Sequence, residues 1–169
     1  MTGLRVSRWS HLVHPHLLLA CVLGATVSAA ACWPAGAQTS DDEVQALVER
    51  AAALIQAVGR AQAFATISRP DGGFVEGDLY VFCDSADGTV LAHGANPKLV
   101  GKNLGDVRDA EGNRPILDGV RLALSQGRGW HEYLWPNTKV GRVQHKRSYV
   151  LRIDDRTVCG SGYYKLDPP

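Results

Sequence analysis

The longest periodic pattern in the chain begins after Ser40, where apolar residues recur three or four positions apart and charged residues take the opposite side. The apolar positions are Val44, Leu47, Val48, Ala51, Leu54, Ile55, Val58, Ala61 and Ala65. This spacing is typical of an amphipathic helix. Ser40 and Glu43 fit a capping box, in which each side chain accepts the backbone N–H of the other residue. Because Arg-Pro-Asp-Gly-Gly at 69–73 marks a turn, we expect one long helix over about residues 41–67.

The apolar face of this helix has two interpretations. It packs on a sheet of the same domain, or it associates with a partner or with a second copy of the chain to form a homodimer. Charged substitutions at Val48 and Ile55 distinguish the two, because they would unfold the protein only if the face belongs to the core.

Five segments of strand length follow the turn. They are residues 79–83, 89–93, 129–135, 144–153 and 157–164. Asp84 to Gly88 predicts a hairpin connection, and residues 115–126 predict a short helix with a proline in its first turn. Because tight hairpins require antiparallel pairing, the pattern predicts an α+β fold. One antiparallel sheet lies within residues 74–165, with the long N-terminal helix on one face and the short helix plus loops on the other.

The first 37 residues predict a signal peptide. Arg5 and Arg8 give a basic start, residues 17–31 are apolar or small, and Ala35-Gly36-Ala37 supplies a cleavage site. The apolar run is shorter than the roughly 20 residues that span a bilayer, and an uncleaved N-terminal anchor is the lesser alternative. A lipoprotein cut before Cys21 would leave the apolar residues beyond it without a role. We therefore expect residues 38–169 to form one periplasmic or secreted domain.

Composition excludes several classes of protein. Removing 37 of the 169 residues leaves 132, with 16 basic and 17 acidic residues and a formal net charge of −1. A nearly neutral chain without a basic stripe predicts no nucleic-acid partner. No residues have zinc-ligand spacing, Cys159-Gly160-Ser161-Gly162 lacks the nucleophile elbow of acyl-transfer enzymes, and we expect no cofactor. An enzyme that uses His93 or Cys159 is only a formal alternative.

Cys83 and Cys159 are the only cysteines of the mature chain. In an oxidising compartment an even pair suggests a disulfide, and neighbouring strands bring opposed Cα atoms within its range. Two separate buried thiols fit the pattern equally well, because the pattern does not give the order of the strands.

Aromatic and cationic residues on the last strands predict a binding pocket. Strand alternation places His131, Tyr133 and Trp135 on one face of their strand, and Lys146 shares a face of the next strand with Ser148. Lys146 either leaves through the rim with its stem on apolar surface or points into the pocket. In the second case its ammonium group gives a carboxylate a charge-assisted hydrogen bond.

Other residues complete the predicted site. Tyr133 and His93 supply donors, and His93 begins the long polar connection 94–114, whose length is typical of a lid or binding loop. Tryptophans supply apolar walls, whereas His131 and His145 are expected at the surface. The predicted ligand is small and anionic, and the predicted ligand-binding residues are His93, Trp130, Tyr133, Trp135 and Lys146.

An ordered set of segments resembles the single Cache domains of bacteria, specifically the second single-Cache type. The segments are GDLYVFCDSADGTVLAH, NPKLVGKNLGDVRDAEGN, GWHEYLWPN, HKRSYVLRI and GSGYYK. The resemblance implies a PAS-like, five-stranded antiparallel sheet and an extracytoplasmic sensor of short carboxylates or related metabolites. The five predicted site residues match recurrent positions of the family. The resemblance also makes the strands of Cys83 and Cys159 neighbours, which favours the disulfide, although cysteine is not usual at either position.

Receptors of this family carry a second membrane segment and a cytoplasmic output domain, whereas this sequence ends at Pro169. We therefore expect a ligand-binding domain that acts through a membrane receptor or transporter partner, or that sequesters its ligand. The alternative is an interaction protein without a ligand, which dimerises through its N-terminal helix.

Overall fold

The computed structural model describes residues 39–165, and the predicted signal peptide lies outside them. Two helices open this part of the chain, α1 (Asp41–Val58) and α2 (Arg60–Ile67). The capping box is confirmed, because Ser40 and Glu43 exchange their hydrogen bonds at 2.8 and 3.2 Å. The expected single helix is divided at Gly59, whose φ of 80° suits a residue without Cβ.

The main sheet has five antiparallel strands in the order β4-β3-β7-β6-β5. Its members are β3 (Phe82–Ser85), β4 (Val90–His93), β5 (Arg128–Asn137), β6 (Arg142–Asp154) and β7 (Thr157–Tyr164). A separate two-stranded sheet pairs β1 (Val75–Glu76) with β2 (Leu79–Tyr80). The expected strand 79–83 is thus divided between two sheets, and β5 continues through Pro136 and Asn137, beyond the expected strand 129–135.

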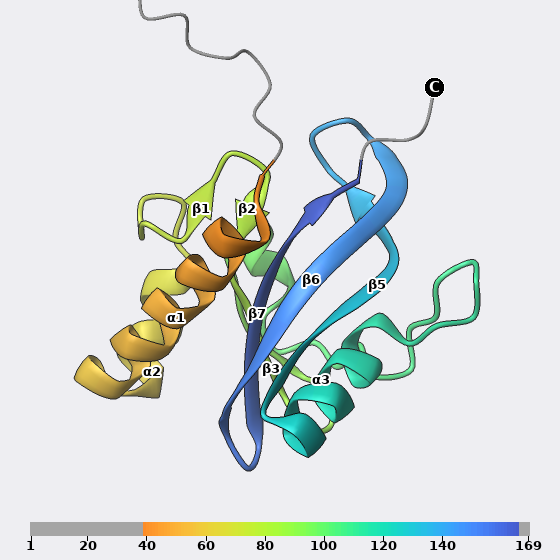
Figure 1. The fold of residues 1–169 in the computed structure, drawn as a ribbon. Helices are drawn as coiled ribbons and strands as arrows, with labels where there is room; N and C mark the ends of the chain where they lie inside the picture. The colour runs from red at the N-terminus through yellow and green to blue at the C-terminus, as the bar shows by residue number, and fades with distance from the viewer. Residues whose placement is uncertain (1–38, 166–169) are drawn as a thin grey trace, which may run out of the picture. The chain divides into compact units, whose positions relative to one another are not determined.

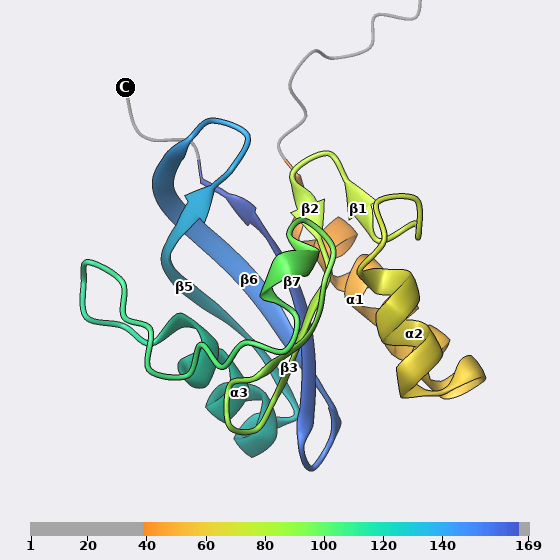
Figure 2. The same cartoon turned by 180° about the vertical axis from the view of Figure 1, so that it is seen from behind.

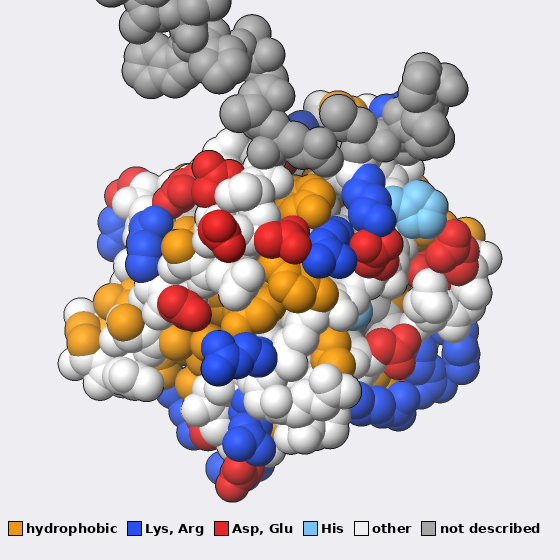
Figure 3. Space-filling view, in the orientation of Figure 1, with side chains coloured by type: hydrophobic (Ala, Val, Ile, Leu, Met, Phe, Trp, Pro, Cys, Tyr) orange, Lys and Arg blue, Asp and Glu red, His pale blue; other side chains and the backbone are white. Residues whose placement is uncertain are grey.

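The helices lie on opposite faces of the main sheet, as predicted. In Figure 1, α1 and α2 lie on the first face, to the left of the strands, and α3 (Pro115–Gln126) lies on the other face, to their right. The long connection that contains the 3-10 turn Pro97–Leu99 is seen in Figure 2. In the same orientation, acidic and basic side chains lie next to one another around a group of hydrophobic side chains (Figure 3).

The apolar stripe of α1 belongs to the core of its own domain. Val48 is 0% exposed and Ile55 is 7% exposed, and both pack in one cluster with residues of the sheet. A homodimer through these two side chains is therefore not available in this fold. Within residues 39–165, no helix combines the length and the apolar character needed to cross a membrane.

Two interactions join α1 and the strands. Asp41, the first residue of α1, accepts hydrogen bonds from Arg147 of β6 at 2.8 Å and from Tyr163 of β7 at 3.1 Å.

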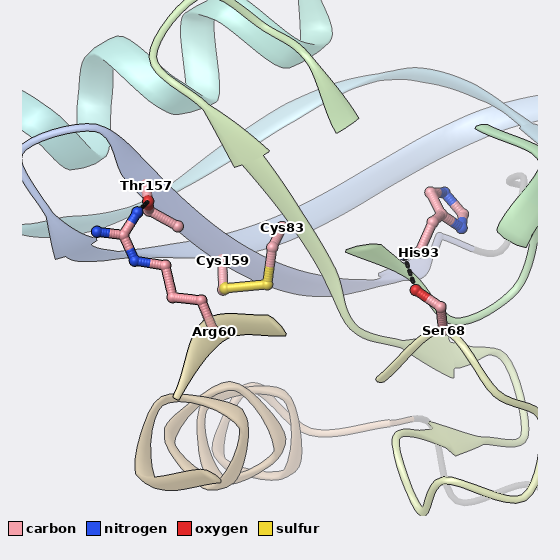
Figure 4. The surroundings of a disulfide bond; sticks show 6 residues. All are labelled: Arg60, Ser68, Cys83, His93, Thr157 and Cys159. Carbon is pink, nitrogen blue, oxygen red and sulfur yellow. Dashed lines mark hydrogen bonds between the residues drawn. A yellow bond between two sulfur atoms is a disulfide. The ribbon is translucent and has the colours of Figure 1, made fainter. Parts of the chain in front are cut away.

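In the register of β3 and β7, Cys83 lies opposite Cys159, and the two form a disulfide (Figure 4). The disulfide implied by the resemblance is confirmed, and both cysteines are fully buried.

Candidate ligand-binding site

Lys146 is the most unusual residue of the α3 face. It lies on β6 between Tyr133 of β5 and Tyr164 of β7 in the strand register, and it is 0% exposed. Its Nζ lies 3.7 Å from the ring centroid of Tyr80, 5.2 Å from that of Tyr164 and 5.7 Å from that of Phe82. The alternative in which this lysine leaves through the rim is therefore wrong.

The ammonium group of Lys146 lacks an acceptor. Among the described residues, no oxygen or nitrogen accepts a hydrogen bond from its Nζ. Burial lowers the pKa of Lys146 well below its ordinary value, and Asp78 offsets this only in part. A buried amine without a partner is costly unless something supplies an acceptor and a countercharge. The three aromatic rings provide cation–π attraction but no acceptor.

His93 ends β4 and is held by two hydrogen bonds. Its backbone N–H donates to Ser68 Oγ at 3.2 Å (Figure 4), and its Nδ1 accepts the N–H of Asn96 at 3.0 Å. Burial, with a smaller contribution from the charge of Lys146, lowers the pKa of His93 to about 4. The ring is therefore neutral at pH 7, and since Nδ1 accepts, the proton lies on Nε2, which is a donor.

Tyr133 brings a hydroxyl group to the same face. Its Oη lies 3.0 Å from Ser148 Oγ, and burial raises the pKa of the phenol. Its ring packs edge-on against Trp135, with centroids 5.9 Å apart. The phenol stays neutral, so that it donates one hydrogen bond and accepts another.

Two adjoining cavities lie beside these residues. An inner chamber of about 10 Å³ is lined by Tyr80, Phe82, Asp84, Val90, His93, Leu104, Ile116, Tyr133 and Trp135. An outer cavity of about 260 Å³ shares Tyr80, His93, Leu104 and Trp135 with it and adds residues of the 94–114 connection. Lys146 lines neither cavity. Because the Tyr80 ring touches both cavities and lies over Nζ, this ring covers the ammonium group.

The structure thus brings together four of the five predicted residues, His93, Tyr133, Trp135 and Lys146. Trp130 lies on the opposite face, where its ring packs 5.3 Å from that of Tyr149 and belongs with the α1 core. One residue along a strand changes the face, so Trp130 cannot share the face of His131.

The expectation that His131 lies at the surface is wrong. α3 crosses β5 so closely that a Cβ on Gly119 would lie 2.7 Å from His131 Nε2, which is buried without a hydrogen-bond partner. Burial lowers the pKa of His131 to about 4. His145 is at the surface, as expected, 3.8 Å from Glu111.

Three residues of the site were missed from the sequence. Tyr80 and Tyr164 surround Lys146, and Asp84 was assigned to the hairpin turn although it lies in β3. Alternation from Phe82 would have placed Asp84 on the inner face. Within residues 39–165, no three His, Cys, Asp or Glu side chains are grouped to hold a metal ion.

Comparisons with known proteins agree with this geometry. The chain is 31% identical over 91 residues both to the sensor histidine kinase MctS of Rhizobium johnstonii and to the methyl-accepting chemotaxis protein McpP of Pseudomonas putida. These 91 residues are 53% of this chain, but only 20% and 17% of the two relatives. The chain therefore spans about a fifth of their length.

A solved Cache chemosensory domain, described with carboxylic acid recognition, has the same fold. It superposes with a TM-score of 0.61 at 24% identity, over 75% of this chain and 99% of that one. Residues 37–164 match the family described as single Cache domain 2. The chain therefore belongs to the single Cache domain 2 family, whose members are extracytoplasmic sensor domains without catalytic activity.

Proposed function

We propose that this domain binds a short carboxylate outside the cytoplasm and that Lys146 holds the carboxylate group. The observation that carries the proposal is the fully buried ammonium group without an acceptor. A carboxylate supplies both the missing acceptor and the missing negative charge, and such a charge-assisted bond is stronger than a neutral one. His93 Nε2 and Tyr133 Oη are further donors on the same face.

The size and lining of the cavities favour a small guest. The outer cavity of about 260 Å³ is below the roughly 300–1,000 Å³ of pockets for drug-sized ligands. Its walls are aromatic and aliphatic except for a few polar groups, which suits a carboxylate with a short apolar part. Because Tyr80 covers Nζ, the guest displaces this ring from the lysine and replaces a cation–π contact with an ion pair.

The relatives support the class of ligand and of signal without determining either. One solved domain of this fold is described with carboxylic acid recognition, and the two curated relatives are a histidine kinase and a chemotaxis receptor. For this chain we propose export by the signal peptide of residues 1–37. The bound domain then acts through a membrane receptor or transporter partner, or it sequesters the ligand.

Thermal unfolding and titration calorimetry with acetate, propionate and pyruvate test the proposal, with propionamide as a matched uncharged control. A ligand at 100 times its Kd stabilises the folded state by about 2.7 kcal/mol. We expect propionate but not propionamide to bind, and Lys146→Met to lose binding. Lys102→Met, at an exposed position, is the control and retains binding. No shift with any short carboxylate, or full binding by Lys146→Met, overturns the proposal.

A further inference from the structure

Asp84 is a buried carboxyl group that has no role in the proposed binding of a carboxylate by Lys146. It lies on β3, opposite Val158 of β7 and Val90 of β4, and is 3% exposed. The pairing of β3 with β4 shifts register between Cys83 and Asp84, and such bulges redirect a side chain. Asp84 shares the inner face with Phe82 and lines the inner chamber.

The hairpin that follows Asp84 does not need this carboxyl group. Ser85, Asp87 and Thr89 hydrogen-bond one another across the turn. Among residues 39–165, no group donates a hydrogen bond to the side chain of Asp84. Burial raises its pKa to about 8.

A purely structural role does not account for Asp84. Its neighbours across both strands are valines, and a branched apolar side chain suits such a position better than a carboxyl group. A buried polar group without a partner is destabilising. The chamber that Asp84 lines has a volume of about 10 Å³, close to the space that one water-sized group occupies.

We propose that Asp84 hydrogen-bonds a hydroxyl group of the ligand, so that the ligand is a hydroxy carboxylate. The inference rests on the proposed function, with Lys146 holding the carboxylate and Asp84 the hydroxyl. A hydroxyl group has the size of the chamber and donates the hydrogen bond that Asp84 lacks. An ammonium group fits less well, because it brings three donors. Apart from Asp84 the chamber offers acceptors only on phenol hydroxyl groups, since Nδ1 of His93 already accepts the N–H of Asn96.

Titration calorimetry with four three-carbon acids tests this assignment: propionate, 2-hydroxypropionate, 3-hydroxypropionate and alanine. We expect the purified protein to bind at least one hydroxypropionate about tenfold or more tightly than propionate, because a site built around a hydroxyl group discriminates against the analogue without it. Asp84→Leu loses this preference and keeps propionate binding. Asp155→Asn, at an exposed turn position, is the control and keeps the preference.

Asp84→Asn is the second variant, because it keeps the size of the side chain if leucine disturbs the chamber, and we expect it to weaken the preference. The inference is overturned if propionate and both hydroxypropionates bind within twofold of one another, or if both Asp84 variants keep the preference. Tighter binding of alanine than of either hydroxypropionate also overturns it and assigns Asp84 to an ammonium group. Failure of all four acids to bind overturns carboxylate binding itself, and the role of Asp84 with it.

Discussion

Lys146 links binding to protonation at the scale of a single residue. Burial lowers the pKa of Lys146 in the empty site, whereas a carboxylate at Nζ raises it, because an opposite charge favours the charged form. If Lys146 holds the carboxylate as proposed, binding takes up protons at any pH between the lowered pKa of the empty site and the raised pKa of the complex, and affinity falls as the pH rises through that range. Calorimetry in phosphate and in Tris, whose ionisation enthalpies differ, measures this uptake as a difference in apparent heat.

The other titratable groups of the face are accounted for in the same experiment. His93 and His131 are neutral at pH 7, and Tyr80, Tyr133 and Tyr164 have raised pKa values. Asp84 loses its proton near pH 8 and then also repels an anion, so the Asp84→Asn background isolates Lys146. Equal apparent heats in both buffers at every pH at which the ligand binds contradict the predicted uptake.

Buried His93 and half-buried His131 predict how stability depends on pH. The pKa of each is lowered from 6.5 to about 4 in the folded state, so the unfolded chain binds more protons between these values. Neutral histidines therefore leave the free energy of unfolding unaffected above pH 6.5. As the pH falls toward 4, each histidine lowers this free energy, by about 3 kcal/mol at most. Lys146 acts in the same direction, and Asp84, with its raised pKa, in the opposite one.

We therefore expect the free energy of unfolding in urea to be lower at pH 4.5 than at pH 6.5. His131→Asn should reduce this difference, whereas His145→Asn at the surface should leave it unchanged. If the free energy of unfolding depends on pH equally in His131→Asn and in the parent protein, the lowered pKa of His131 is contradicted.

At the scale of elements, α1 offers a test of core against surface on one helix. Val48 is fully buried, while Ala53 is exposed. Val48→Asp places a charge in the core and is expected to cost at least about 3 kcal/mol of stability. Ala53→Asp changes stability by less than about 1 kcal/mol. Circular dichroism during urea unfolding measures both, and a folded Val48→Asp monomer would restore the dimer interpretation of the stripe.

Elements with a clear period were predictable, and elements without one were not. The α1 stripe and the hairpin of β5 and β6 follow from spacing alone. In contrast, Leu-Tyr-Val-Phe-Cys at 79–83 is apolar throughout, so no alternation marks where the chain leaves one sheet and enters the next. Tyr80 was missed for this reason. The division at Gly59 was missed because a glycine within a helical pattern is often tolerated.

Resemblance and pattern contributed differently to the candidate site. Alternation placed Tyr133 and Trp135 on one face, and His93 was added as a donor because it begins the long connection 94–114. Trp130 was included as an apolar wall, although alternation assigned it to the other face, and the resemblance then matched all five residues. The close approach of α3 that covers Nε2 of His131 depends on tertiary packing at Gly119, which no local pattern encodes.

At the scale of the whole molecule, the disulfide closes most of the domain into a loop. Cys83 and Cys159 are 76 positions apart, and on the chain-entropy relation a bond across that separation stabilises by about 4 kcal/mol. The variant Cys83→Ala/Cys159→Ala should lose about that much in urea unfolding without a change of fold. Reductant should lower the parent protein to a similar value and leave the variant unaffected. A loss below about 1 kcal/mol in both comparisons contradicts the prediction.

Two consecutive residues of strand β6 make contacts on opposite faces of the sheet. Lys146 lies on the face of the cavities, beneath the ring of Tyr80, and Arg147 binds Asp41 at the start of α1. A single peptide unit therefore separates the recognition of a guest from the anchoring of the opposite helix. Any sliding of this strand that brings the amine closer to a guest also displaces the guanidinium from its carboxylate. The proposed contact with the guest on one side and the attachment of α1 on the other thus depend on the position of the same strand.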